Sequence, residues 1–305
     1  MKNYIIIFLI FPTVFSSCQK DATNVKLPPA KILLVVQSFI SPQEALVKVY
    51  VSKSTPIFGY KQQANYNTIK DATVEITNNN IVYKVLYSIQ EDAYTIDSTL
   101  LKIIAGETYN LKVTHGTEMV TASCVVPYTL PFDLSLDKIE LKAEIDQHTK
   151  DTMSTYYRLA TSFTDLKSPS DYYRLFISSE SKIWEYVYDN QGNIIDSNLN
   201  GRNNYAYFEN DEHEFVTDAE YDNKKVIQNS TIFLAEGKGE RIQRTSITFG
   251  IMHTDINYYK YHTSAIAHMN NQDNPFAEPS LVFTNIQGGL GIFAAYNYRY
   301  WVKNL

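Results

Sequence analysis

The residues best suited to covalent chemistry lie near the start of this 305-residue chain, in the segment VFSSCQKDAT (residues 14–23). The thiolate of a cysteine is a strong nucleophile, and Cys18 directly follows two small residues, Ser16 and Ser17. Small residues after an apolar run are typical of a cleavage site for removal of a leader segment. Cys18 is therefore either a residue of the fold or a group modified when the preceding segment is removed.

The segment before Cys18 has the plan of a secretory signal. Lys2 supplies a positive start, and Tyr4 to Phe15 form an almost unbroken apolar run. A helix that crosses a bilayer needs roughly 20 apolar residues, and this run is shorter. We therefore predict that residues 1–17 are a signal peptide that is removed.

The junction itself resembles a bacterial lipobox, although Phe15 stands where leucine is commoner. That motif implies that the Cys18 thiol receives a diacylglyceryl group and that its amine is then acylated. At about 0.8 kcal/mol per buried CH₂, such lipid chains anchor a protein far more firmly than one myristoyl chain. The alternative is a cysteine that stands beside a cleavage site by chance.

The residues after Cys18 resemble an export signal that is followed by a spacer. Gln19, Lys20 and Asp21 resemble the short signal that sends Bacteroidota lipoproteins to the cell exterior. Two prolines, at positions 28 and 29, favour extended backbone. Residues 18–30 are therefore predicted to be a lipidated tether.

Composition predicts a mainly β fold. The chain has 24 Tyr and 15 Phe but only 11 Gly, and aromatic residues suit half-buried pleated surfaces. Its formal charge is −6, and its 27 basic residues are spread along the length. A nucleic-acid partner would need basic residues gathered on one face, so none is expected.

Strand and turn patterns divide the chain in two. Residues 31–131 show short alternating strands and predict an immunoglobulin/transthyretin-like β-sandwich. Pro127 and Pro131 mark the boundary, and residues 132–305 form a second β-rich domain. Cys124, on the last strand of the sandwich, is predicted to be a core residue without a disulfide partner.

One helix is predicted in the second domain, at about residues 255–271. This stretch lacks Gly and Pro, and Thr254 or Asp255 could be its N-cap. The residues expected to face the sheet share one helical face. They are Tyr258, Tyr261, Ala265 and Met269.

Three glycines near the C-terminus resemble a dinucleotide-binding loop only superficially. Gly288, Gly289 and Gly291 are followed by too few residues for the helix and strand of that fold. They are predicted to allow positive φ or close strand packing. The six histidines and the serines form no metal or nucleophile motif, so we expect no enzyme and no cofactor besides the lipid.

An acidic stretch offers oxygen ligands for calcium. The candidate ligands are Asp211, Glu212, Glu214 and Asp218. Their spacing does not follow an EF-hand loop. The competing interpretation is a solvated loop that binds no metal.

Three aromatic residues could form a ligand platform. Trp184, Tyr186 and Tyr188 alternate along one predicted strand, so their rings share a face. Such a face could bind a sugar or a peptide. The competing interpretation is that the rings pack in the core.

A family resemblance covers nearly the whole mature chain. The segment NPFAEPSLVFTNIQGGLGIFAAY (residues 274–296) is similar to the closing motif of the domain of unknown function 4249 family of Bacteroidota lipoproteins. VVQSFIS, DATVEIT, GETYNLKV, ASCVVP, FTDLKSPSDYYRL and FVTDAEYDNKKV resemble earlier blocks of that family, in the same order. One departure is Asn223, where the family often has glycine.

The resemblance implies a lipid-anchored outer-membrane protein whose gene lies beside one for a TonB-dependent receptor. We therefore expect a surface-exposed accessory binding subunit of a nutrient uptake system. The main alternative is a structural or adhesive surface lipoprotein without a transport role. An unrecognised hydrolase is a third interpretation.

Lipid attachment at Cys18 gives the first prediction. Cys18→Ala removes the only thiol at the cleavage site, so metabolic labelling with a radioactive fatty acid should fall to background. The variant should also leave the membrane fraction. Cys124→Ala is the matched control, and equal labelling of wild type and Cys18→Ala would contradict the assignment.

Overall fold

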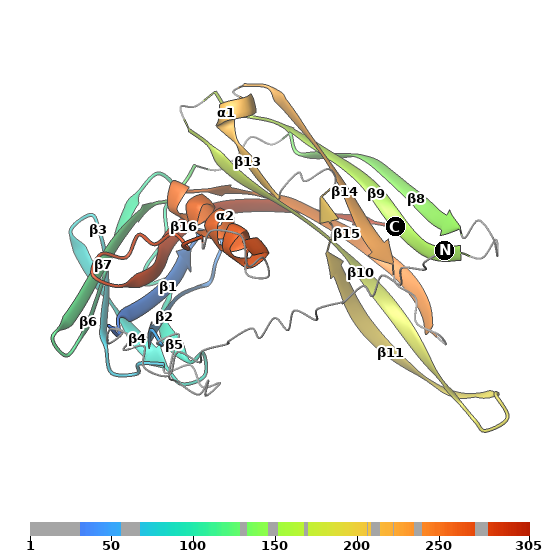
Figure 1. Ribbon diagram of the computed structural model, residues 1–305, viewed down its shortest axis with the longest axis horizontal. Coiled ribbons are helices and arrows are strands. Elements are labelled where there is room, and N and C mark those ends of the chain that lie inside the picture. The colour runs from blue at the N-terminus through green and yellow to red at the C-terminus, as the bar shows by residue number, and fades with distance from the viewer. Residues whose placement is uncertain are drawn as a thin grey trace, which may run out of the picture. The chain divides into compact units, whose positions relative to one another are not determined.

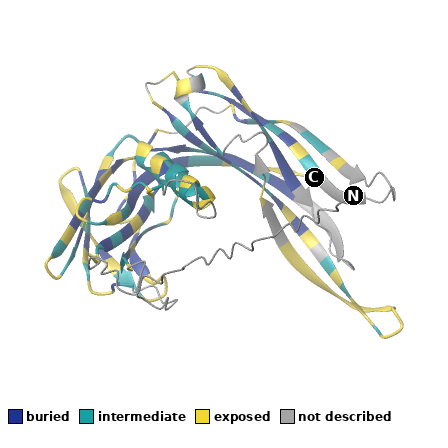
Figure 2. Cartoon of the chain, viewed as in Figure 1, coloured by how far each residue is buried: buried dark blue, intermediate teal, exposed yellow. Residues whose placement is uncertain are grey.

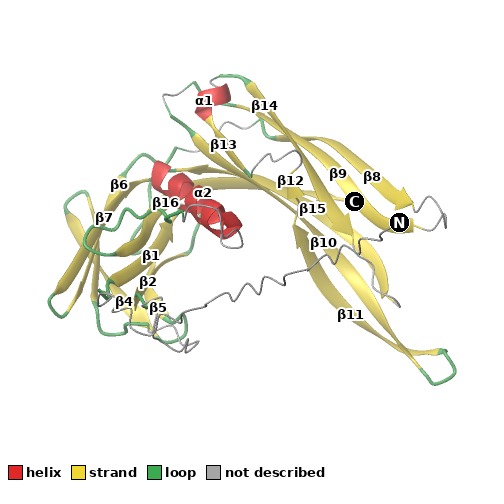
Figure 3. Cartoon of the chain, viewed as in Figure 1, coloured by secondary structure: helices red, strands yellow, loops and turns green. Residues whose placement is uncertain are grey.

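A computed structural model describes residues 31–55, 68–128, 133–145, 152–167, 170–205, 207–208, 214–221, 223–234, 240–271 and 280–305 (Figure 1). The chain divides into two compact units, Met1–Lys31 and Ile32–Leu305. The second unit is built mainly of strands, which confirms the predicted class (Figure 3). In the described residues, neither helix is both long enough and apolar enough to cross a membrane.

The described elements follow one another along the second unit. The first half contains β1 (Leu34–Ile40), β2 (Leu46–Lys53), β3 (Thr73–Asn78), β4 (Ile81–Ser88), β5 (Ala93–Asp97), β6 (Thr108–His115), β7 (Glu118–Val125), β8 (Ser135–Ile145) and β9 (Thr152–Thr164). The second half contains β10 (Tyr172–Tyr188), β11 (Ile194–Tyr205), β12 (Tyr207–Phe208), β13 (Phe215–Thr217), α1 (Asp218–Tyr221), β14 (Lys225–Leu234), β15 (Glu240–Thr254), α2 (Ile256–Asn271) and β16 (Leu290–Asn304).

The strands β1 to β7 surround one hydrophobic core. Their side chains alternate between buried and accessible, as in β6, where Tyr109, Leu111 and Val113 are buried. A period of two places such residues on one face of a strand. Cys124 of β7 belongs to this core, as predicted, and burial raises the pKa of its thiol well above the ordinary value.

A second core joins two sheets. One is the large sheet with the order β11-β10-β15-β16-β1-β2-β5-β4-β3-β6-β7, and the other has the order β12-β14-β9-β8. Leu175 of β10 and Ile251 of β15 come from the first sheet, whereas Leu159 of β9 and Val226 of β14 come from the second. All four side chains are buried, so the two sheets are held together by apolar packing.

The last strand connects the two halves of the large sheet. β16 pairs in parallel with β1, where Val35 lies opposite Leu290, and antiparallel with β15, where Thr254 lies opposite Tyr296. The domain boundary expected at residues 127–133 stays a prediction. The strand order itself continues from one half to the other through β16.

The helix α2 covers part of the large sheet and begins where the sequence predicts. Asp255 is its N-cap, because Oδ1 accepts a hydrogen bond from the Tyr258 N–H at 2.8 Å. Tyr258 is buried and Tyr261 is half-buried against a third apolar cluster. Met269 was expected on this face, but its side chain is 59% exposed. The prediction for Met269 is wrong because Ile266, one turn earlier, reaches this cluster instead.

The glycines after α2 have the predicted backbone roles. Gly288 and Gly291 have positive φ, at 82° and 110°. A Cβ on Gly291 would lie 1.9 Å from the Val36 carbonyl oxygen of the adjacent strand. Only glycine therefore allows β16 to approach β1 at this point.

Gly291→Ala should destabilise the fold by at least about 3 kcal/mol, because it combines a backbone clash with an unfavourable φ. Urea denaturation measures the change. Gly201→Ala on β11 is the control, since its Cβ would meet nothing within 4 Å. Equal stability of the two variants would contradict the close approach of β1 and β16.

Candidate functional site

A cavity of about 440 Å³ lies where several elements begin or end. Its wall is formed by the end of β7 and the residues after it, the start of β10, the end of β15 and the first residues of α2. The apolar part of the wall includes Val126, Pro127 and Ile256. The volume suits a small ligand, since such sites measure about 300–1,000 Å³.

His253 is buried in this wall with both ring nitrogens engaged. Nδ1 lies 2.8 Å from the Tyr128 carbonyl oxygen, and Nε2 lies 3.0 Å from Asp171 Oδ1. A carbonyl oxygen only accepts, so Nδ1 carries a proton. The other ring nitrogen, Nε2, is occupied by its contact with the Asp171 carboxyl group. The ring therefore has no free nitrogen for a reacting molecule.

Asp171 has one oxygen without a partner. Its side chain is buried, and Oδ2 accepts no hydrogen bond from any described residue. A buried carboxylate oxygen that lacks a donor is costly. Asp171 is therefore the polar group of the cavity wall with unused hydrogen-bonding capacity.

Asp255 is the second buried carboxylate of the wall. Oδ2 accepts from Asn257 Nδ2 at 3.2 Å, while Oδ1 caps α2. Burial raises the pKa of Asp255 from 3.8 to about 7, although its hydrogen bonds from the backbone oppose this shift. Asp255 therefore titrates near neutral pH.

A cluster of aromatic rings surrounds Arg174 beneath α2. The guanidinium donates to Tyr258 Oη at 2.6 Å, forms an ion pair with Glu214 at 3.0 Å and lies over the Phe215 ring. His262 stacks on Phe215 in the same cluster. Burial, and then the charge of Arg174, lower the pKa of His262 to about 4, so the ring is neutral at pH 7.

The calcium candidates are not brought together by the described structure. Glu214 pairs with Arg174, and Asp211 and Glu212 lie outside the described residues, as does the side chain of Asp218. Among the described residues, no group of three acidic, histidine or cysteine side chains could hold a metal ion. The calcium site stays a prediction.

The predicted aromatic platform lies on the outer half of β10. Trp184 and Tyr186 are half-buried and Tyr188 is exposed, and none of the three belongs to an apolar core cluster. Trp184 lies opposite Leu199 of β11, which is 57% exposed. Figure 2 shows that β11 is exposed along its described length. Ligand binding by the platform stays a prediction.

The structure extends this platform across four neighbouring strands, β11, β10, β15 and β16. Directly paired residues point to the same face, so Phe176 of β10 shares its face with Gly250 of β15 and Tyr300 of β16. We call this surface the open face. Its aromatic and aliphatic members are Phe176, Trp184, Tyr186, Tyr188, Leu199, Tyr205, Tyr298, Tyr300 and Val302, and the charged residues Glu180 and Lys182 lie on the same face.

Part of the open face was missed in the sequence, although a signal was present. Tyr296, Tyr298 and Tyr300 alternate in the segment YNYRY, and their rings follow one another at centroid distances of 6.0 and 6.2 Å. His253 and Asp171 carried no such signal. They are 82 positions apart and meet only through the pairing of β10 with β15.

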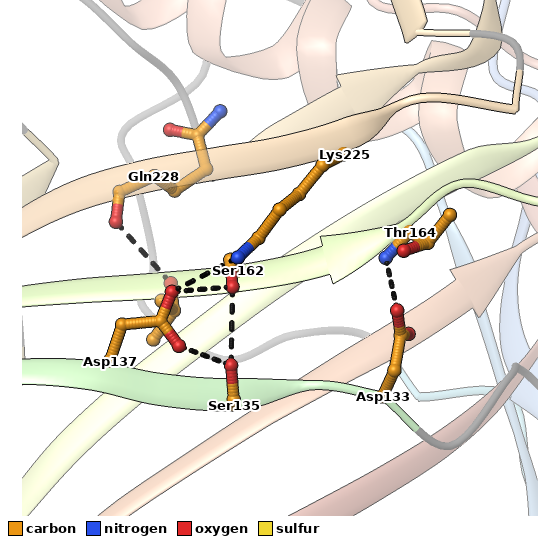
Figure 4. Close-up of polar contacts among 8 residues, drawn as sticks. Asp133, Ser135, Asp137, Ser162, Thr164, Lys225 and Gln228 are labelled. Atoms are coloured by element: carbon orange, nitrogen blue, oxygen red, sulfur yellow. Dashed lines mark hydrogen bonds and ion pairs between the residues drawn. The ribbon is translucent and has the colours of Figure 1, made fainter.

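A polar cluster joins the strands of the smaller sheet. Ser162 Oγ donates to Asp137 Oδ2 at 2.7 Å, Ser135 Oγ donates to the other oxygen, and Lys225 Nζ lies 3.5 Å away (Figure 4). The hydrogen bonds from Ser135 and then Ser162 lower the pKa of Asp137. Asp137 lies at a bulge in the pairing of β8 with β9, so the cluster stabilises an irregular part of this strand pair.

The lipidation and export residues lie outside the described part of the chain. These residues are Cys18, Gln19, Lys20 and Asp21. Comparison with protein families matches residues 20–300 to the Domain of unknown function (DUF4249). The chain belongs to the DUF4249 family. No curated protein matches the sequence.

The DUF4249 match includes the cavity and the open face but starts after Cys18. It confirms the family that the ordered sequence blocks indicated. The family description assigns no activity to any residue, so the roles of Asp171, His253 and Asp255 rest on their geometry. Lipid attachment remains a prediction from the sequence.

The raised pKa of Asp255 predicts a pH-dependent stability. Between about pH 4 and 7, the folded protein keeps a proton on the Asp255 carboxyl group that the unfolded chain releases. The stabilisation that comes from protonated Asp255 is therefore full below about pH 4 and is lost as the pH rises through about 7. Asp255→Asn removes the titration and keeps a capping oxygen.

The free energy of unfolding of Asp255→Asn, relative to wild type, should therefore rise by about 2–3 kcal/mol between pH 5 and pH 8. Urea denaturation at both pH values measures the difference. Asp196→Asn, on exposed β11, controls for the loss of a surface carboxylate. A constant difference between wild type and Asp255→Asn would contradict the shift.

Proposed function

We propose that this DUF4249 protein is a lipid-anchored outer-membrane protein, facing the cell exterior, that serves as an accessory binding subunit of a TonB-dependent uptake system. The anchor rests on Cys18 and the residues around it. The partnership rests on the resemblance to a family found beside such receptors. The physical observation that supports a protein partner is the open face.

The open face combines exposed aromatic side chains with charged ones, since Glu180 and Lys182 of β10 lie among them. Protein interfaces are enriched in aromatic residues. Tyr205 is 73% exposed, Tyr300 is 54% exposed and Val302 is 55% exposed, and these residues lie on β11 and β16 of one sheet, with β10 and β15 between them. Large apolar surfaces that remain exposed commonly mark interaction sites.

The helix α2 limits the open face at one end. Arg174 of β10 and Met252 of β15, which precede the open face along the sheet, contact Tyr258 of α2. Beyond these residues, no described helix packs on the face. The outer half of this face can therefore receive the extracellular loops of a receptor.

A pull-down from native outer membranes tests the proposal. The tagged wild-type protein, extracted in mild detergent, should recover a TonB-dependent receptor at a near-stoichiometric ratio. The double variant Tyr205→Ser/Tyr300→Ser should reduce this recovery at least about tenfold, because aromatic residues supply much of the binding energy at interfaces. Mass spectrometry identifies and quantifies the recovered proteins.

Ile89→Ser is the matched control, because this apolar side chain is 86% exposed in the turn after β4. Recovery of the lipoprotein alone, still held to the membrane through Cys18, would instead favour a structural or adhesive surface protein. Deletion strains separate the two functions. Loss of growth on one nutrient supports uptake, whereas loss of attachment with normal growth supports adhesion.

A further inference from the structure

The large sheet ends in two edge strands, β7 and β11, which differ in how their outer edges are used. The edge of β7 is bridged by a later segment, since Thr121 and Gln287 exchange backbone hydrogen bonds of 3.2 and 2.8 Å. Among the described residues, none pairs with the outer edge of β11 (Figure 3). Such an edge presents N–H and C=O groups that can pair with another strand.

The sequence of β11 lacks the features that usually discourage such pairing. Exposed edges are commonly blunted by lysine, by proline or by bulges. The edge strand β8 of the smaller sheet has Lys138, Lys142 and two irregularities in its register. β11 contains neither lysine nor proline, and its one register irregularity lies at the hairpin end, beside Tyr188. Most of its edge is therefore regular and suited to a further strand.

The outer part of the hairpin formed by β10 and β11 receives little support from its own chain. β15 pairs with β10 as far as Glu185, and beyond this residue only β11 pairs with β10 in the described structure. Residues 194–201 of β11 are all exposed. An isolated two-stranded hairpin is only marginally stable in water. A strand added beside β11 would therefore stabilise this part of the sheet.

The sequence of β11 is complementary to itself. Its two charged residues, Asp196 and Arg202, stand equally far from Leu199 on either side. When β11 pairs antiparallel with an identical strand, only a pairing centred on Leu199 sets these two residues opposite each other. A twofold axis repeats each contact, so the opposite charges meet twice. Opposite charges that face each other stabilise a strand pair.

We infer that β11 pairs with β11 of a second copy of this chain, antiparallel and centred on Leu199. The pairing runs at least from Asp196 to Arg202 and joins the large sheets of the two copies. Leu199 is 57% exposed and belongs to the open face, so the open faces of the two copies adjoin. The pairing is independent of the proposed receptor, because it uses the edge of the sheet and leaves the open face uncovered.

Disulfide cross-linking of the purified full-length protein in mild detergent tests this pairing. Directly opposed residues of antiparallel strands have Cα atoms about 4.5–5.5 Å apart, and disulfides span about 4.4–6.8 Å. Leu199→Cys should therefore form a disulfide-linked homodimer on mild oxidation, which non-reducing electrophoresis and mass spectrometry detect. Wild type should form none through Cys124, because this thiol is buried.

Ile195→Cys is the matched control, because Ile195 lies on the same strand and is 63% exposed. In the inferred register the two copies of this residue are more than about 20 Å apart along the strands, which is too far for a disulfide. Leu199→Cys should give at least about tenfold more homodimer than Ile195→Cys. Equal yields, no homodimer from Leu199→Cys, or a disulfide between that variant and a different protein would overturn the inference.

A charge exchange distinguishes the inferred register from chance collision. Asp196→Arg, added to Leu199→Cys, sets two arginines opposite each other and should lower the homodimer yield at least about threefold. Adding Arg202→Asp as well restores opposite charges and should restore the yield. A yield that the first exchange leaves unchanged, or that the second does not restore, would contradict this register.

Circular dichroism establishes that each variant is folded. The substituted side chains Leu199 and Asp196 are exposed, so folding should be preserved. Receptor recovery in the pull-down is measured separately from homodimer yield. Failure of either proposal therefore leaves the other interpretable.

Discussion

The hydrogen bonding of β16 on both of its edges is the constraint on which the rest of the structure depends. One edge pairs in parallel with β1, and the other pairs antiparallel with β15. Successive side chains of β16 also enter different clusters, since Phe293 lies in the first core and Ala294 lies in the cluster under α2. Near its end, Trp301 packs against the second core. A single strand therefore supports the apolar packing of the whole described unit.

The cavity is a consequence of this arrangement. β15 is held beside β16, and it presents His253 and Asp255 to the start of β10 and the end of β7. Burying these polar groups is acceptable because most of their hydrogen-bonding atoms are satisfied by backbone groups or by one another. The one exception is Asp171 Oδ2, which is buried and accepts no hydrogen bond from a described residue. The fold thus creates an unsatisfied polar position inside an apolar site.

Local patterns in the sequence predicted the local structure well. Alternation predicted the strands around Cys124, the cap and turn residues predicted α2, and the glycines around the start of β16 predicted close backbone approach. The prediction that Met269 faces the sheet was wrong, because helical spacing alone does not show how far a sheet extends beneath a helix. The Asp171–His253 pair could not be predicted, because it depends on the register of β10 against β15. The open face was only partly predicted, since one strand was recognised and its neighbours were not.

The pairing of Val35 with Leu290 joins the first and last described strands of the chain. Contacts between residues so distant in sequence are slow to form, because a long loop must close before they contribute any stabilisation. Until β16 pairs with it, β1 therefore has only β2 as a neighbour, and one of its edges remains without hydrogen bonds. The fold is completed by β16, so removal of this strand would leave the first core open.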